Sequence, residues 1–259
     1  MTKIIKVAIL IFFFIYVTTG ITLFIFQKDL VYYPNKQDFD SCLGFEDSQK
    51  INVNGTRMYF RKNNNKLIVF YHGNAGSACD RTHLKNKFEE LGLSYLFVEY
   101  YGYSNALNKP TKKLLIKDVE NVNEFLNDKN FSETTIMGES LGTALAIHHS
   151  TIVEIDKLLL ISPFFSMAEV AKNSLKIYPT SPFLKENYES YKWIKNSKAK
   201  KLKIVHGDID DLVPIKQSKE LYKKVLITNK EFVEVDGANH NDIYGFDETI
   251  KAINQFLAE

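Results

Sequence analysis

The chain has 259 residues, of which 45% are hydrophobic and 25% are charged. This is enough apolar material for one sizeable domain. Its 33 Lys and Arg residues nearly balance 31 Asp and Glu residues and are spread along the chain, which argues against a nucleic acid or an acidic polymer as the partner.

The first 26 residues differ in kind from the rest. No charged residue occurs from Val7 to Phe26, where Ile, Phe, Val and Leu dominate. About 20 apolar residues suffice to cross a bilayer core as a helix. A cleaved signal peptide has a shorter apolar region of about 7–15 residues that ends in small residues, and residues 17–24 fit that pattern poorly. Segment 1–26 is therefore predicted to be an uncleaved transmembrane anchor.

The charges that flank this span indicate an orientation. Lys3 and Lys6 precede it, whereas Lys28 follows it beside Asp29. Cytoplasmic flanks carry an excess of lysine and arginine. By a margin of one residue, the sequence predicts a single-pass protein with a cytoplasmic N-terminus and the remaining domain outside the cytoplasm.

The segment after the anchor lacks a sustained period. Residues 27–50 are expected to form an irregular connector, so that the globular domain covers residues 51–259. This domain opens with two β-prone pieces on either side of Asn54-Gly55, which is a strong hairpin signal.

Two cysteines occur, Cys42 and Cys79, without metal-ligand spacing. Two unpaired thiols are favoured over a disulfide bond. A domain exported to an oxidising compartment would still permit the bond.

From residue 67 onward, short and almost wholly apolar runs alternate with longer amphipathic stretches. Such runs suit strands that are buried on both faces of a parallel sheet. The expected strands are residues 67–71, 95–100, 134–137, 158–161, 202–205 and 232–235. The expected helices, from the spacing of apolar residues, are 112–127, 218–227 and 248–257. This alternation predicts a doubly wound α/β fold with helices on both faces of the sheet.

One interval breaks the alternation. Residues 163–200 contain three prolines and no strand signal. They are expected to form an excursion over the sheet, a small cap that is helical in parts.

Residues suited to nucleophilic catalysis follow four of the expected strands. The sequences at these strand ends are His72-Gly73-Asn74, Gly138-Glu139-Ser140-Leu141-Gly142, Asp208-Ile209-Asp210-Asp211 and Asn239-His240. Functional groups gather at the carboxyl ends of the strands in an open parallel sheet. We therefore expect these side chains to meet at one edge.

The Gly-x-Ser-x-Gly sequence between a strand and a helix has the spacing of a nucleophile elbow, with Ser140 as the nucleophile. His240 is the expected general base, because imidazole titrates near neutral pH. Asp210 is the expected acid that orients it. The backbone N–H groups of Leu141 and Asn74 are the expected oxyanion donors.

Several other residues have structural interpretations that compete with functional ones. His72 and His206 are expected to hydrogen-bond loop backbone, and His148 and His149 diverge by about 100° on a helix, so they cannot share a metal. Tyr32-Tyr33-Pro34 is expected to lie at a membrane interface rather than in the site. Five aromatic residues of the excursion suit an acyl pocket or a core equally well: Phe164, Phe165, Tyr178, Phe183 and Trp193.

The ordered motifs resemble the α/β-hydrolase superfamily. They are Gly-x-Ser-x-Gly, then His-Gly-x-x-Asp-x-x-Val-Pro from His206, then Gly-Ala-Asn-His-Asn-Asp around His240. An apolar anchor followed by residues 26–34, His-Gly-Asn-Ala-Gly and Tyr-Gly-Tyr-Ser is similar to the membrane-anchored serine hydrolase branch. The resemblance covers nearly the whole chain and implies an eight-stranded, mostly parallel sheet and metal-independent hydrolysis of esters, thioesters or amides.

Two departures from the family pattern matter. Tyr101 stands where the family commonly has arginine, so any ion pair made there is absent. The acid loop is crowded, because Asp208, Asp210 and Asp211 compete. The family pattern favours Asp210, four residues after His206, with Asp211 as the main alternative.

Together these features predict a membrane-tethered serine hydrolase that cleaves carboxylic esters or thioesters through an acyl-enzyme. Its substrate would be a small-molecule or lipid-like acyl compound, and neither a cofactor nor a metal is expected. An amidase or peptidase on the same triad, or a catalytically silent scaffold with this fold, are the alternatives.

Overall fold

The computed structural model describes residues 3–106 and 108–259. Its centre is an eight-stranded sheet with the strand order β10-β9-β8-β7-β4-β6-β3-β2. Its strands are β2 (Gln49–Val53), β3 (Thr56–Arg61), β4 (Lys66–Tyr71), β6 (Ser94–Glu99), β7 (Glu133–Glu139), β8 (Ile155–Ile161), β9 (Ala199–Gly207) and β10 (Asn229–Val235). All pairings are parallel except β2 with β3 and β3 with β6. This confirms the mostly parallel sheet and the hairpin at Asn54-Gly55.

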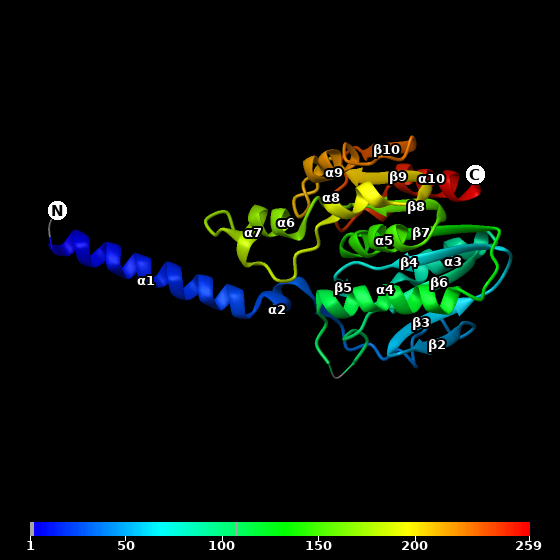
Figure 1. Cartoon of the computed structure of the whole chain (residues 1–259), viewed down its shortest axis with the longest axis horizontal. Coiled ribbons are helices and arrows are strands. Elements are labelled where there is room, and N and C mark those ends of the chain that lie inside the picture. Colours follow the sequence, from blue (N-terminus) through cyan, green and yellow to red (C-terminus); the bar gives the residue numbers. More distant parts are fainter. Residues whose placement is uncertain (1–2, 107) are drawn as a thin grey trace.

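Helices cover both faces of the sheet (Figure 1). Side chains of α3 (Thr82–Glu90) and α10 (Asp247–Ala258) belong to one core cluster. Those of α4 (Lys112–Leu126), α5 (Leu141–Ile152) and α9 (Ile215–Tyr222) belong to another. Along β4, alternate residues enter the two clusters, because successive side chains of a strand point to opposite faces. The part of a strand that lies between two cores is apolar, as residues 67–71 of β4 are.

One helix differs from its predicted position. The stretch 218–227 was expected to be helical, but α9 runs from Ile215 to Tyr222. Pro214 lies at its N-cap and sets an earlier start.

Helix α1 (Lys3–Ile25) extends away from the sheet (Figure 1). Its 23 residues have a mean hydropathy of 2.4 and include no buried residue, so it is long and apolar enough to cross a membrane. The first two residues of the expected anchor lie outside the described part of the chain.

The connector contains regular structure where none was expected. Helix α2 (Gln27–Val31) follows α1, and β1 (Tyr33–Pro34) pairs in parallel with β5 (Ala75–Gly76), which lies in the loop after β4. Each of these strands has two residues, which is too short to leave an alternating hydrophobic pattern in the sequence. The connector thus reaches the loop that was expected to supply an oxyanion donor.

The prediction that Tyr32-Tyr33-Pro34 lies at a membrane interface is wrong for Tyr32. Its side chain is 4% exposed. Its hydroxyl donates to Glu186 Oε2 at 2.7 Å and lies 2.7 Å from the Tyr188 hydroxyl. A buried hydroxyl needs a hydrogen-bond partner. Glu186 and Tyr188, which are far from Tyr32 in the sequence, supply these partners and so allow Tyr32 to be buried.

The prediction of two free thiols is also wrong. Cys42 and Cys79 form a disulfide with a Cα–Cα distance of 5.8 Å. The bond links the connector to the 3₁₀ turn η1 (Ala78–Arg81), and only the folded course of the connector brings the two residues together.

The cap comprises residues 163–198, between β8 and β9. It contains α6 (Met167–Ser174), α7 (Thr180–Phe183), α8 (Ser190–Trp193) and the 3₁₀ turn η2 (Ile194–Asn196), in agreement with a partly helical excursion. Helices α6 and α7 project from the sheet beside α1 (Figure 1).

Candidate active site

Ser140 occupies the sharp turn between β7 and α5. Its φ is 49° and its ψ is −116°, a conformation that is costly for a residue with a Cβ atom. Its N–H donates to Ile161 O at 2.9 Å, and its carbonyl accepts from Thr143 N at 3.0 Å and from Thr143 Oγ1 at 2.6 Å. These bonds hold the strained turn.

The glycines on either side of Ser140 are required by close packing. A Cβ atom at Gly138 would lie 2.5 Å from Gly142 O. One at Gly142 would lie 2.5 Å from the carbonyl carbon of Tyr71 and 2.6 Å from His72 O. Helix α5 can therefore begin directly against the end of β4, as the Gly-x-Ser-x-Gly spacing predicts.

Ser140, His240 and Asp210 meet at the carboxyl edge of the sheet. His240 Nε2 lies 2.9 Å from Ser140 Oγ, and His240 Nδ1 lies 2.7 Å from Asp210 Oδ2. The imidazole can therefore accept the hydroxyl proton on one nitrogen while the carboxylate binds the other.

Asp210 is buried and held by several donors. Its Oδ1 accepts from the N–H groups of Leu212 at 3.1 Å and Val213 at 2.7 Å. His206 Nε2 lies 3.1 Å from its Oδ2. Burial raises the pKa of this carboxyl, but hydrogen bonds from His206 and His240 outweigh it and hold the pKa well below its usual value. The acid is therefore ionised wherever a histidine base works.

The neighbouring carboxylates have other positions. Asp208 Oδ1 accepts from Gly237 N at 2.7 Å, and Asp242 Oδ1 accepts from Asn239 N at 2.7 Å. Asp211 is exposed. Within the described residues, Asp210 alone contacts the His240 ring through a carboxylate.

Both expected oxyanion donors lie beside Ser140. Leu141 is the first residue of α5, so its N–H has no acceptor within the helix, and the aligned peptide dipoles favour negative charge there. Asn74 lines the same cavity as Ser140. Its side-chain amide donates to Val31 O at 3.1 Å, and the hydrogen bonds of residues 3–106 and 108–259 include none donated by its backbone N–H.

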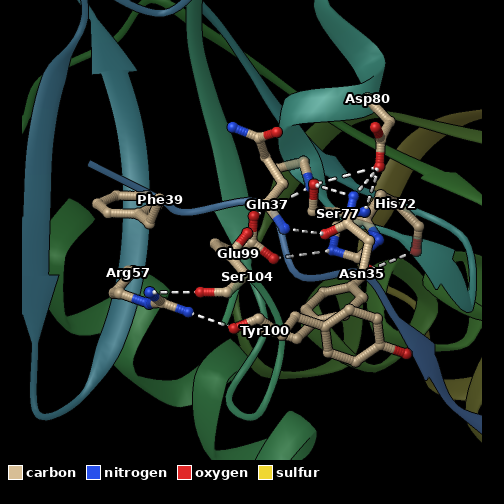
Figure 2. A network of polar contacts seen from close by, with 12 residues as sticks. Asn35, Gln37, Phe39, Arg57, His72, Ser77, Asp80, Glu99, Tyr100 and Ser104 are labelled. Atoms are coloured by element: carbon tan, nitrogen blue, oxygen red, sulfur yellow. Dashed lines mark hydrogen bonds and ion pairs between the residues drawn. The ribbon is translucent and has the colours of Figure 1, made fainter. Parts of the chain in front are cut away.

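The carbonyl groups of the Asn74 loop are fixed by buried side chains. The Tyr100 hydroxyl donates to His72 O at 2.6 Å, and the Tyr103 hydroxyl donates to Asn74 O at 2.8 Å. His72 Nδ1 bonds Gly73 O at 2.7 Å, which confirms its expected bond to loop backbone. Figure 2 shows His72 beside Glu99, whose Oε1 lies 3.6 Å from His72 Nε2 with both side chains fully buried.

An ion pair next to Ser140 left no recognisable signal in the sequence. Arg81 Nη2 lies 2.8 Å from Glu139 Oε1, and the Tyr244 hydroxyl donates to Glu139 Oε2 at 3.4 Å. Burial opposes ionisation of Glu139, yet Arg81 holds its pKa below the usual value. A Cβ atom at Gly73 would lie 2.9 Å from Glu139 Oε1, so the glycine lets this pair pack against the Asn74 loop.

Two cavities of different character meet at Ser140. One has a volume of about 760 Å³ and apolar walls from the cap and α1. The other, about 200 Å³, is lined by polar groups that include Arg81, Glu139 and His240. Such a division suits a substrate with an apolar acyl part and a small polar part.

The five aromatic residues of the excursion divide between cavity and core. Phe164, Tyr178 and Phe183 line the apolar cavity. Phe165 instead stacks on Tyr191 with ring centroids 4.5 Å apart, and Trp193 packs on Tyr188 and His148.

His149 is a packing residue, as expected. Its Nδ1 lies 2.9 Å from the Tyr71 hydroxyl, and burial lowers its pKa to about 3. It therefore stays neutral and takes no part in the site.

Comparisons with known proteins identify the family to which this fold belongs. No family model matches the chain. It is 30% identical over 260 residues to the Mycobacterium tuberculosis protein Rv2307c, covering 94% of this chain and 92% of that protein. It is also 30% identical over 187 residues to a putative alpha/beta hydrolase, L404, of Acanthamoeba polyphaga mimivirus, covering 69% and 68% of the two chains.

Solved structures share the fold. The Pyrococcus furiosus esterase Pf2001 superimposes with a TM-score of 0.67 at 21% identity, over 81% of this chain and 88% of that one. Est1E from Butyrivibrio proteoclasticus gives 0.63 at 17% identity, over 82% and 96%. The chain belongs to the α/β-hydrolase superfamily.

Proposed function

We propose that this protein is a serine hydrolase that cleaves carboxylic esters or thioesters. One observation carries the proposal: Ser140 Oγ, His240 and Asp210 are hydrogen-bonded in series at the carboxyl edge of the sheet, and the backbone of Ser140 is strained. A strained backbone that is held at such a turn is typical of a nucleophile.

In the first half-reaction, Ser140 Oγ attacks the acyl carbonyl carbon while His240 Nε2 takes the hydroxyl proton. The carbonyl electron pair moves to oxygen, and the N–H groups of Leu141 and Asn74 bind the resulting oxyanion. When this intermediate collapses, the bond to the leaving alcohol or thiol breaks, and His240 returns the proton to it. The acyl group is then bound to Ser140 as an ester.

In the second half-reaction, water attacks the acyl-enzyme and His240 accepts its proton. Collapse releases the carboxylic acid and restores the Ser140 hydroxyl. Asp210 stabilises the imidazolium in both steps without itself becoming protonated.

Helix α1 would anchor the enzyme in a membrane, with the hydrolase domain outside the cytoplasm. The Lys3 and Lys6 flank supports this orientation, and so does the Cys42–Cys79 disulfide, because disulfides persist in oxidising compartments. A phosphatase reporter that is active only outside the cytoplasm, fused to Glu259, tests it. A fusion protein that is expressed in full but has no phosphatase activity would reverse the orientation.

The catalytic proposal is tested with Ser140→Ala. We expect the variant to lose both hydrolysis of p-nitrophenyl butyrate and labelling by a fluorophosphonate probe, with an unchanged circular dichroism spectrum. Ser132→Ala, at an exposed serine, should match the wild type. Hydrolysis retained by Ser140→Ala would end the proposal.

Ester, thioester and amide cleavage use the same machinery, so substrate assays separate them. Acyl-thioesters and aminoacyl amides run beside nitrophenyl esters would rank the three. A folded wild type that never reacts with the probe would instead favour the non-catalytic scaffold.

A further inference from the structure

Helix α1 is packed against the cap. The Tyr16 ring stacks on Tyr178 with centroids 4.7 Å apart and an interplanar angle of 6°. The Tyr16 hydroxyl donates to Ile177 O at 3.0 Å, and the Tyr178 hydroxyl donates to Tyr16 O at 3.2 Å. A Cβ atom at Gly20 would lie 3.2 Å from the Tyr178 ring, so a residue without a side chain allows the close approach.

A second contact lies near the end of α1. Lys185 N donates to Gln27 Oε1 at 2.6 Å, and Gln27 Nε2 donates to Phe24 O at 2.7 Å. The Lys185 ammonium lies 4.6 Å from the centre of the Phe24 ring. Tyr16 and Phe24 are 8 residues apart, about 12 Å along α1. The cap therefore meets α1 at two levels with a gap between them.

The apolar cavity fills this gap and reaches the nucleophile. Its walls include Ile21 and Phe24 of α1 and Val170 and Leu175 of the cap, and its inner end includes Ser140. Its volume of about 760 Å³ falls in the range of ligand sites. One wall of a site beside Ser140 thus belongs to the helix that was predicted only to be an anchor.

The depth of the contact decides where the cavity opens. Tyr16 lies nine residues before Ile25, about 13.5 Å along the helix, whereas half of a hydrocarbon core is about 15 Å. A membrane-spanning α1 therefore carries the Ile177 loop below the headgroups. Ile177 is 72% exposed and Phe183 is 58% exposed, as suits lipid contact.

We propose that α1 and the cap form a channel for the acyl chain, open to the hydrocarbon of the bilayer. The substrate is then an amphiphilic acyl ester taken laterally from the membrane, with its chain along Ile21 and Val170 and its carbonyl carbon at Ser140. This rests on the proposed hydrolase activity.

The channel is tested with Ile21→Trp, which blocks its α1 wall. The control is Ile15→Trp, because Ile15 is 53% exposed and Ile21 54% exposed on the same helix, but Ile15 does not line the cavity. The 259-residue chain is assayed in lipid nanodiscs with p-nitrophenyl esters of four to twelve acyl carbons. When the ester concentration is expressed as that free in water, each buried methylene should raise the wild-type kcat/KM about fourfold until the channel is filled.

Ile21→Trp should lower kcat/KM for the twelve-carbon ester at least tenfold and leave the four-carbon ester within twofold. Ile15→Trp should leave both unchanged. Val170→Trp repeats the block from the cap, and four-carbon hydrolysis reports that each variant is folded. Equal chain-length profiles for the three variants would overturn the channel, whereas absence of any Ser140-dependent hydrolysis would overturn the proposed function.

Opening into the bilayer is tested separately. Ile177→Trp, in a Trp193→Phe background, should be quenched by lipids with brominated acyl chains. Leu226→Trp is the control, because Leu226 is 74% exposed and lies beside β10, away from the cap. Equal quenching at the two positions would overturn lateral entry.

Discussion

Replacing Asp210 by asparagine tests which group orients the proposed base. The wild-type carboxylate accepts the proton on His240 Nδ1 at 2.7 Å, which leaves Nε2 free to accept from Ser140. The asparagine oxygen would keep the N–H groups of Leu212 and Val213, which bond Oδ1. Its amide would then face His240 and donate to Nδ1, so that the proton moves to Nε2.

The expected loss follows from this change of tautomer. With a proton on Nε2, His240 cannot take the Ser140 proton, and the uncompensated imidazolium forms less readily. The same change in a serine protease triad lowers kcat about 10⁴-fold, equivalent to about 5 kcal/mol of activation free energy. His206 Nε2 lies 3.1 Å from Asp210 Oδ2 and would also face the NH2 group of the asparagine. We therefore expect kcat to fall by at least this factor.

The measurement is kcat and KM for p-nitrophenyl butyrate at pH 8. Asp211→Asn is the matched control, because Asp211 follows Asp210 in the chain but is exposed, and we expect less than a threefold change for it. The reasoning is refuted if Asp210→Asn keeps more than a tenth of the wild-type kcat, or if Asp211→Asn loses as much.

Three further predictions concern stability and the elbow. Burial raises the pKa of Asp118 to about 7, so the contribution of this residue to stability is complete below about pH 4 and is lost as the pH rises to 7. Over this range, thermal unfolding should show that the free energy of unfolding of the wild type falls by about 1.4 kcal/mol per pH unit more than that of Asp118→Asn. Asp128→Asn is the control and should behave as the wild type does. Replacing Cys42 and Cys79, 37 residues apart, by alanine should lower the free energy of unfolding by about 4 kcal/mol from loop entropy; equal denaturation midpoints would contradict this. Gly142→Ala should lower the free energy of unfolding by about 1–3 kcal/mol through overpacking and should also lower kcat. Unchanged stability and unchanged kcat would show that α5 can move away from β4 to make room for the methyl group.

The sheet and the positions of Ser140 and His240 could be predicted because each depends on local sequence, whereas Asp210 was chosen over Asp208 and Asp211 only through the resemblance to the family pattern. The part of a strand that lies between two cores is apolar, as residues 67–71 of β4 and 158–161 of β8 are, and these apolar runs end where their strands end. Parallel strands bring those ends to one edge, so Ser140 and His240 could be placed together without knowing the packing.

Contacts that depend on the course of the whole chain left no such signal. Cys42 meets Cys79 only because the connector returns to the loop after β4, where β1 pairs with β5. Tyr32 reads as an interfacial aromatic until its partner Glu186, 154 residues away, is known. In each case the prediction was made from the residue's own segment, and the structure places a distant segment against that residue.

Helix α1 shows the same limit, because hydropathy cannot distinguish the two roles proposed for it, a membrane anchor and a wall of the acyl channel. Ile15 and Ile21 have equal hydropathy and nearly equal exposure, yet only Ile21 lines the cavity that contains Ser140. A side chain that is stable in lipid is equally stable against the apolar walls of a channel. If α1 were removed, the cap side of the cavity, including Leu175 and Phe183, would become an open apolar surface, which soluble proteins seldom tolerate. Helix α1 and the proposed acyl site are thus one structural unit, and activity measured without α1 would describe a different site.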